Sequence, residues 1–65
     1  MPLTPRQLRT LRARVGLTQA ALASLIGVAR VTYARWECGL HPIAESDARH
    51  VQMIVEKLLD KQGNT

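Results

Sequence analysis

The sequence predicts an all-α fold, a compact bundle of four helices that forms one domain over residues 1–65. Three observations support this prediction. The chain has 65 residues, of which 46% are apolar, enough for a single small core. Tyr33 and Trp36 are its only aromatic residues, so the core must be built from aliphatic side chains, which suit helices. Apolar residues also recur at helical spacing between glycines and prolines.

The first helix is expected to begin at Thr4-Pro5, because threonine caps helix N-termini and proline is tolerated in the first turn. Leu8 and Val15 then fall on one face of the helix. Gly16 is the expected end, because glycine adopts a positive φ without a Cβ clash.

The second helix is expected to follow Thr18 as its N-cap and to run to about Ile26, with Gly27 as the turn residue. Its alanines give high helix propensity. Ala23 in particular is small enough for another helix to approach closely, and Leu22 supplies part of the apolar face.

The third helix, expected from Arg30 to Glu37, has two different faces. Tyr33 and Trp36 share one side, where burial is favoured and the tyrosine hydroxyl could still reach the surface. Stacking of Trp36 on a nucleic-acid base is the alternative to its burial. The other side carries Arg30, Val31, Ala34 and Arg35.

The last helix is expected over about residues 44–61 and has a wide apolar stripe. The stripe consists of Ala44, Ala48, Val51, Ile54, Val55, Leu58 and Leu59. Its width suggests two uses, one in the core and one in contact with a second copy. The alternative is that the protein's own core covers the whole stripe.

Charge is distributed unevenly along the chain. The part up to Trp36 has six arginines and no acid, whereas the part from Glu37 onward has five acids and three basic residues, which gives a net charge of +4. If the charged residues served only solubility, acidic and basic residues would be mixed along the chain. A basic N-terminal part therefore predicts an electropositive face, whose usual partner is nucleic acid.

Several classes of protein do not fit the composition. A single cysteine, Cys38, excludes an internal disulfide framework and a cysteine-rich zinc site. We find no catalytic motif, and we expect no enzyme activity, cofactor, metal or small-molecule ligand. No apolar run is long enough for a membrane span or a signal peptide, so a cytoplasmic location is expected.

The stretch LTQAALASLIGVARVTYARWECG places two short helices around a tight turn at Gly27. This spacing predicts a helix-turn-helix over residues 18–37. With its GLTQ, LA, turn glycine and WE-x-G features, the segment from Thr4 to Gly39 resembles the lambda-repressor/Cro-type family, also called Xre-type. The resemblance implies a bacterial or phage DNA-binding regulator. The chain departs from the family at Ala29, where serine or threonine is common, and at Cys38. Family members also commonly have a fifth helix, so a bundle of five helices is the alternative to the predicted four.

The third helix is the predicted recognition helix, because an α-helix fits the major groove of B-DNA. Arginine can form two hydrogen bonds with guanine, and an apolar side chain can touch a thymine methyl. One arginine alone would equally suit a phosphate contact or solvation, but two together favour reading of the groove. The predicted base-reading residues are Arg30, Val31, Thr32, Ala34 and Arg35.

Other residues are expected to contact the DNA backbone or to stabilise the fold. The resemblance implies a phosphate contact by Gln19 and an ion pair between Arg12 and Glu37, for which the alternative is two solvated charges. The predicted backbone contacts are Thr18, Gln19, Arg6, Arg9 and Arg14, of which the three arginines are expected to be solvated and to add no sequence preference.

These observations predict a dimeric repressor on a palindromic operator, because one small recognition helix makes few base contacts. The expected partner contacts are Val51, Ile54, Val55, Leu58 and Leu59. Similar small proteins repress their own operons in phages, plasmids and anti-CRISPR loci, and association with the nucleoid would follow. Two alternatives remain open, namely an antitoxin and a protein-interaction module with a basic face.

Overall fold

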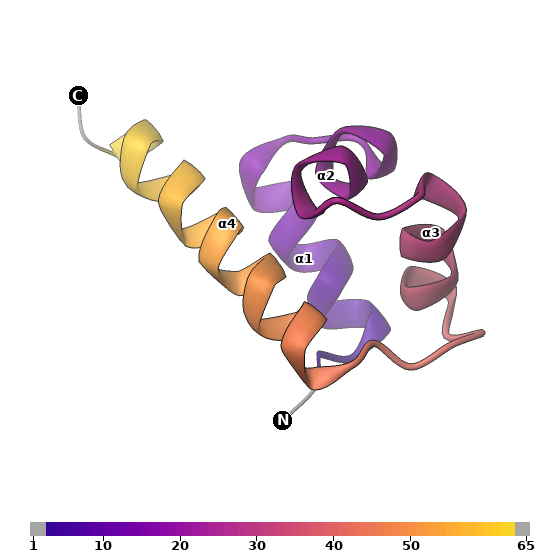
Figure 1. Cartoon of the computed structure of the whole chain (residues 1–65). Helices are drawn as coiled ribbons and strands as arrows, with labels where there is room; N and C mark the ends of the chain where they lie inside the picture. The colour runs from indigo at the N-terminus through magenta and orange to yellow at the C-terminus, as the bar shows by residue number, and fades with distance from the viewer. Residues whose placement is uncertain (1–2, 64–65) are drawn as a thin grey trace.

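The computed structural model describes the backbone of residues 3–63 and the side chains of residues 3–61, arranged as four helices (Figure 1). These are α1 (Pro5–Val15), α2 (Gln19–Ile26), α3 (Arg30–Cys38) and α4 (Glu45–Gly63). The predicted all-α fold of four helices is confirmed. The third helix is one residue longer than expected, and the fourth begins one residue later and ends two residues later.

Local capping explains where the first two helices begin. The Thr4 hydroxyl accepts a hydrogen bond from the Gln7 backbone (3.1 Å), and the Gln7 side chain accepts one from the Thr4 backbone (2.9 Å). Thr18 caps α2 by accepting from the Ala21 backbone at 3.1 Å. Each bond satisfies an amide that the helix itself leaves unpaired. Gly27 ends α2 with φ of 91°, a left-handed conformation that side chains with a Cβ rarely adopt.

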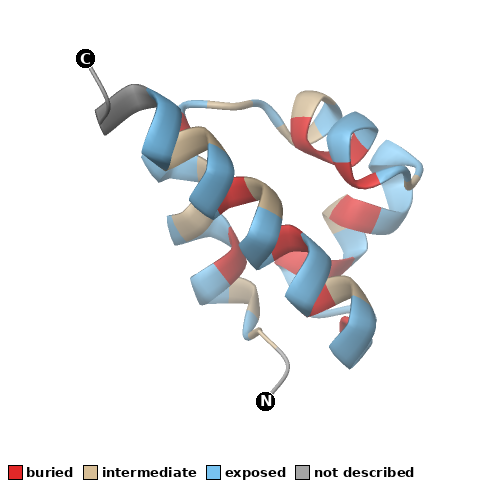
Figure 2. Ribbon diagram, turned by 60° about the vertical axis from the view of Figure 1, so that its left-hand side comes forward, coloured by how far each residue is buried: buried red, intermediate tan, exposed pale blue. Residues whose placement is uncertain are grey.

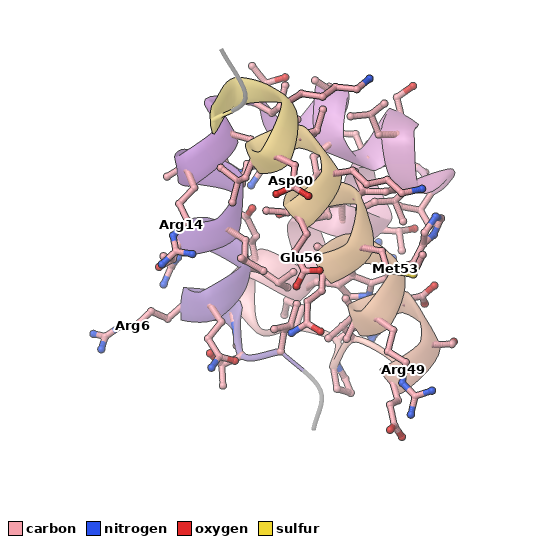
Figure 3. The ribbon with its side chains drawn as sticks, turned by 90° about the vertical axis from the view of Figure 1, so that its left-hand side faces the viewer. Arg6, Arg14, Arg49, Met53, Glu56 and Asp60 are labelled. Atoms are coloured by element: carbon pink, nitrogen blue, oxygen red, sulfur yellow. The ribbon has the colours of Figure 1, made fainter. Side chains whose placement is uncertain are left out.

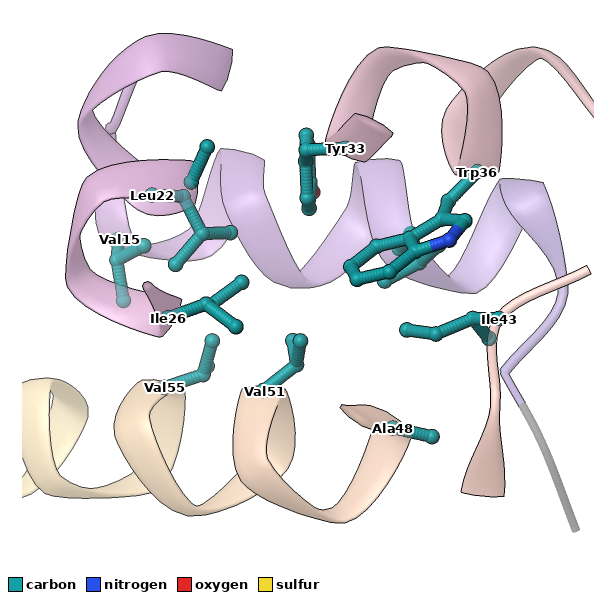
Figure 4. Packing of buried hydrophobic residues seen from close by; sticks show 11 residues of the cluster. Val15, Leu22, Ile26, Tyr33, Trp36, Ile43, Ala48, Val51 and Val55 are labelled. Atoms are coloured by element: carbon teal, nitrogen blue, oxygen red, sulfur yellow. The ribbon is translucent and has the colours of Figure 1, made fainter. Parts of the chain in front are cut away.

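The core lies between α4 on one side and α2 and α3 on the other, with α1 packed along them (Figure 4). α1 and α2 each contact both α3 and α4. The largest fully buried side chains of the core are Leu8, Leu22, Tyr33, Val51 and Val55. Ala23 is buried at the crossing of α2, as its small size predicts. The exposed residues lie on the outward sides of all four helices (Figure 2).

One residue of the predicted α4 stripe lies elsewhere. Ala44 is exposed and precedes the helix, where its carbonyl accepts the first helical hydrogen bond from the Ala48 amide at 2.9 Å. The expectation that Ala44 packs in the core is therefore wrong. A helix can only place a residue on its apolar face once the chain has entered the helix, and α4 begins at Glu45.

Candidate nucleic-acid interface

Helix α3 separates aromatic burial from basic exposure. Tyr33 and Trp36 lie in the core, where their rings meet edge to face with centroids 5.9 Å apart. The prediction that the aromatics are buried while Arg30 and Arg35 face outward is confirmed. The alternative in which Trp36 stacks on a base is wrong, because only 6% of Trp36 is exposed.

Four of the five predicted base-reading residues are exposed. Arg30, Thr32 and Arg35 are open to solvent, and Val31 is 50% exposed. Ala34 is half-buried on the same helix. The exposed side of α3 therefore presents two guanidinium groups, a hydroxyl and an apolar side chain together.

An ion pair connects α3 to α1. The Arg12 Nε atom lies 2.6 Å from one carboxylate oxygen of Glu37, and its Nη2 atom donates to the other oxygen at 3.1 Å. The third arginine nitrogen donates to the Leu17 carbonyl at 3.1 Å. Glu37 is 3% exposed and Arg12 25%. The pair that the resemblance implies is thus present, and it is two-pronged and largely removed from water, unlike the alternative of two solvated charges.

Gln19 links α2 to the same carboxylate. Its side-chain nitrogen donates to Glu37 at 3.1 Å. Glu37, near the end of α3, therefore binds both Arg12 of α1 and Gln19 at the start of α2. An amide nitrogen carries two hydrogens. One is used here, and the other can serve a ligand outside the protein. The family resemblance implies that Gln19 supports the third helix, and the structure identifies Glu37 as its partner.

The ionisation of this cluster follows from burial and hydrogen bonding. Burial of Glu37 opposes its negative charge, but hydrogen bonding from Arg12 and the neighbouring groups outweighs burial and lowers the pKa of the carboxyl. The hydrogen bond to Glu37 raises the pKa of Arg12. The pKa of Tyr33 is raised, first by burial and then by the Glu37 carboxylate beside it.

The Tyr33 hydroxyl does not reach the surface, contrary to expectation. Tyr33 is fully buried, and its hydroxyl has no hydrogen-bond partner among the described residues. The long aromatic side chain points into the core, where α3 packs against α1 and α2. The neighbouring carboxylate of Glu37 is instead held by Arg12 and Gln19.

The predicted DNA-backbone residues fall into two groups. Arg9 lines a hollow together with Gln19 and Ala34, next to the exposed side of α3. Thr18 is exposed at the start of α2, close to Gln19 in the chain. Arg6 and Arg14, by contrast, extend from α1 beside α4, on the face that also carries Glu56 and Asp60 (Figure 3). The structure does not bring these two arginines together with the recognition helix.

The predicted partner-contact residues of α4 also separate. Val51 and Val55 are fully buried in the protein's own core, so neither has surface left for a second copy. Ile54, Leu58 and Leu59 are half-buried beside that core. Of the five predicted contact residues, only these three keep surface for a partner.

Other functional groups are few within the described residues. No cluster of three or more histidine, cysteine or acidic residues occurs there that could hold a metal. Cys38 is a free, exposed thiol whose sulfur lies 3.6 Å from the Arg35 carbonyl. Among the helices that the structure describes, none combines the length and apolar character needed to cross a bilayer.

Comparison with known proteins agrees with this architecture. The family model for the helix-turn-helix domain matches residues 6–60, which covers all of α2 and α3 and most of α1 and α4. The chain therefore belongs to the helix-turn-helix domain family, a class of DNA-binding proteins, in agreement with its Xre-type resemblance. A search of curated proteins found no match.

Proposed function

We propose that this protein is a sequence-specific regulator of transcription that inserts α3 into the major groove of double-stranded DNA. The observation that supports this most is the exposed side of α3. Arg30, Arg35 and Val31 stand there together, while the buried face of the same helix is fixed by Tyr33 and Trp36. Arginine and an apolar side chain are the groups that read guanine and thymine in this groove.

The hydrogen-bonded group of Glu37, Arg12 and Gln19 positions α3 relative to α1 and α2, as reading of the groove by α3 requires. Glu37 lies on α3, Arg12 on α1, and Gln19 at the first residue of α2. The free N–H of Gln19 can donate to a phosphate oxygen, with Arg9 lining the same hollow and the exposed Thr18 next to Gln19 in the chain. Such backbone contacts set the register of a recognition helix in its groove.

We further propose that two copies bind a palindromic operator and repress by blocking a promoter. Dimeric helix-turn-helix proteins place their recognition helices about 34–36 Å apart, at neighbouring turns of the groove. Repression by occlusion needs only tight, specific binding. An operon under its own control, in a phage, a plasmid or an anti-CRISPR locus, is the setting that we propose.

The test is selection of bound duplexes from a random pool, followed by affinity measurements on single-base variants of the selected site. The Arg35→Ala and Arg30→Ala variants should each lose about 1–3 kcal/mol at one base position and tolerate other bases there. Arg49→Ala removes an exposed arginine on α4 and is the matched control. Equal weakening by Arg35→Ala on every sequence would assign that arginine to a phosphate instead.

A further inference from the structure

The loop between α3 and α4 presents an apolar side chain to solvent. Leu40 is 71% exposed, the highest value among the exposed large hydrophobic residues. Its backbone is not loose, because the Leu40 amide donates to the Arg35 carbonyl at 3.0 Å after Gly39 turns with φ of 82°. In this type of helix end, the residue after the glycine usually packs back on its own helix. Leu40 does not, so its position is fixed while its side chain has no partner.

A hollow is lined by Gly39 and His41, the chain neighbours of Leu40. It is lined mainly by apolar groups from the chain start, the end of α3 and the loop, among them Leu3, Pro5, Trp36, Pro42 and Ile43. The segment from Cys38 to Ala44 has no lysine, arginine, aspartate or glutamate. A projecting leucine and an apolar hollow thus stand next to each other on an uncharged surface.

We propose that this surface is where the second copy docks, with Leu40 of each copy entering the hollow of the other. A two-fold contact requires that one patch hold both halves of the fit, as this one does. The proposal rests on the proposed function in that it names the face through which the operator-bound pair forms. The loop runs directly out of α3 (Figure 1), so this docking surface adjoins the end of the proposed recognition helix.

A second apolar hollow suits a second copy less well. It lies where α2 meets the C-terminal half of α4, around Leu25, Ile54 and Leu58. Lys57 and Lys61 stand at its edge with a single acid, so two such patches would bring like charges together. Its α4 residues, Ile54 to Lys61, belong to the C-terminal half of that helix.

The test compares Leu40→Ser with Leu25→Ser, which removes a leucine that is 50% exposed at the other hollow. Sedimentation over a micromolar concentration series gives the dimer dissociation constant of each protein. Leu40→Ser should raise that constant about 100-fold, because two leucines per dimer lose their burial. Leu25→Ser should leave it unchanged. Both substitutions are at exposed positions, and matching thermal unfolding will show that the variants remain folded.

Binding to the selected duplex separates this inference from the proposed function. On a single half-site, Leu40→Ser and the unchanged protein should bind equally, whereas on the full palindrome the variant should lose cooperativity. An unchanged dimer constant in Leu40→Ser, or weakening by Leu25→Ser instead, would overturn the docking surface. Failure of the unchanged protein to select any duplex would overturn DNA recognition, while the sedimentation result would still decide the docking surface.

Discussion

At the scale of single residues, Glu37 has the most demanding position in the protein. It is the first acid in the chain and is almost fully buried. A buried carboxylate is costly unless its oxygens are paired. Arg12 and Gln19 supply that pairing from two other helices, so one side chain joins the body of the domain to both helices of the helix-turn-helix.

Glu37→Ala should destabilise the protein by about 3 kcal/mol, because it leaves the guanidinium of Arg12 without its partner. We take the lower end of the usual range because Arg12 keeps contact with water. The control is Glu45→Ala, which removes an exposed pair with Arg49 and should cost less than about 0.5 kcal/mol. Urea denaturation of both variants measures the difference, and equal losses would contradict a special role for Glu37.

The same residue predicts a loss of stability in acid. The folded-state pKa of Glu37 lies below its ordinary value of 4.5, so its contribution is complete above that value and disappears as pH falls through the lowered pKa. Melting temperatures measured from about pH 7 to pH 3 should therefore decline below about pH 5. Glu37→Gln, which cannot titrate, should show a shallower decline. Parallel curves for the two proteins would rule out this source.

At the scale of the helices, capping is strong on α1 and α2 but absent on α3. Thr4 and Thr18 cap the first two helices through their hydroxyls. Ala29 stands at the N-cap of α3 and makes no side-chain hydrogen bond. The proposed recognition helix therefore begins without the side-chain cap that α1 and α2 have.

Ala29→Ser should stabilise the protein by about 1 kcal/mol, because a serine at the N-cap satisfies one of the free amides of α3. The backbone of Ala29 is already extended, as this position requires. Chemical denaturation measures the gain, and Thr18→Ala at the N-cap of α2 should show a loss of similar size. A neutral or destabilising Ala29→Ser would mean that water already satisfies this end of α3.

At the scale of the whole molecule, the fold divides the positive charge of α1 between two faces. Arg9 lines the hollow near Gln19 and α3, whereas Arg6 and Arg14 stand beside α4 (Figure 3). Only the first face coincides with the proposed DNA contact. The basic N-terminal part of the sequence is therefore not one continuous basic surface.

This division predicts different effects on the salt dependence of DNA binding. Each phosphate contact that is lost reduces the slope of log affinity against log salt by about 0.9. Arg9→Ala should reduce the slope by about this amount, with no change in base preference. Arg6→Ala, the matched control on the other face, should leave the slope unchanged. Titrations of the selected duplex at several salt concentrations will measure both, and equal slopes would contradict the division.

Much of the fold could be predicted because its signals are local. Thr4 and Thr18 sit one residue before a helix, and Gly16, Gly27 and Gly39 each end one with positive φ. Such residues act within a single turn of the chain, so their effect does not depend on distant neighbours.

The candidate site was predictable only in part. The two faces of α3 follow from helical periodicity, which assigns Tyr33 and Arg35 to different sides without any other helix. The hydrogen bond from Gln19 to Glu37, the full burial of Val51 and the position of Arg6 beside α4 depend on how the helices cross. Periodicity places a residue on a face but does not say which other helix covers that face.

By itself, the sequence determined four helices, the ends of the first two, the helix-turn-helix and the outward direction of its arginines, because these depend on neighbours within a few positions of the chain. Tertiary structure alone decided that Glu37 joins three helices, that α4 uses its two central valines for the core, and that Leu40 stands uncovered beside a hollow. The physical reason is that burial and hydrogen bonding between helices depend on distances in space that helical spacing does not contain.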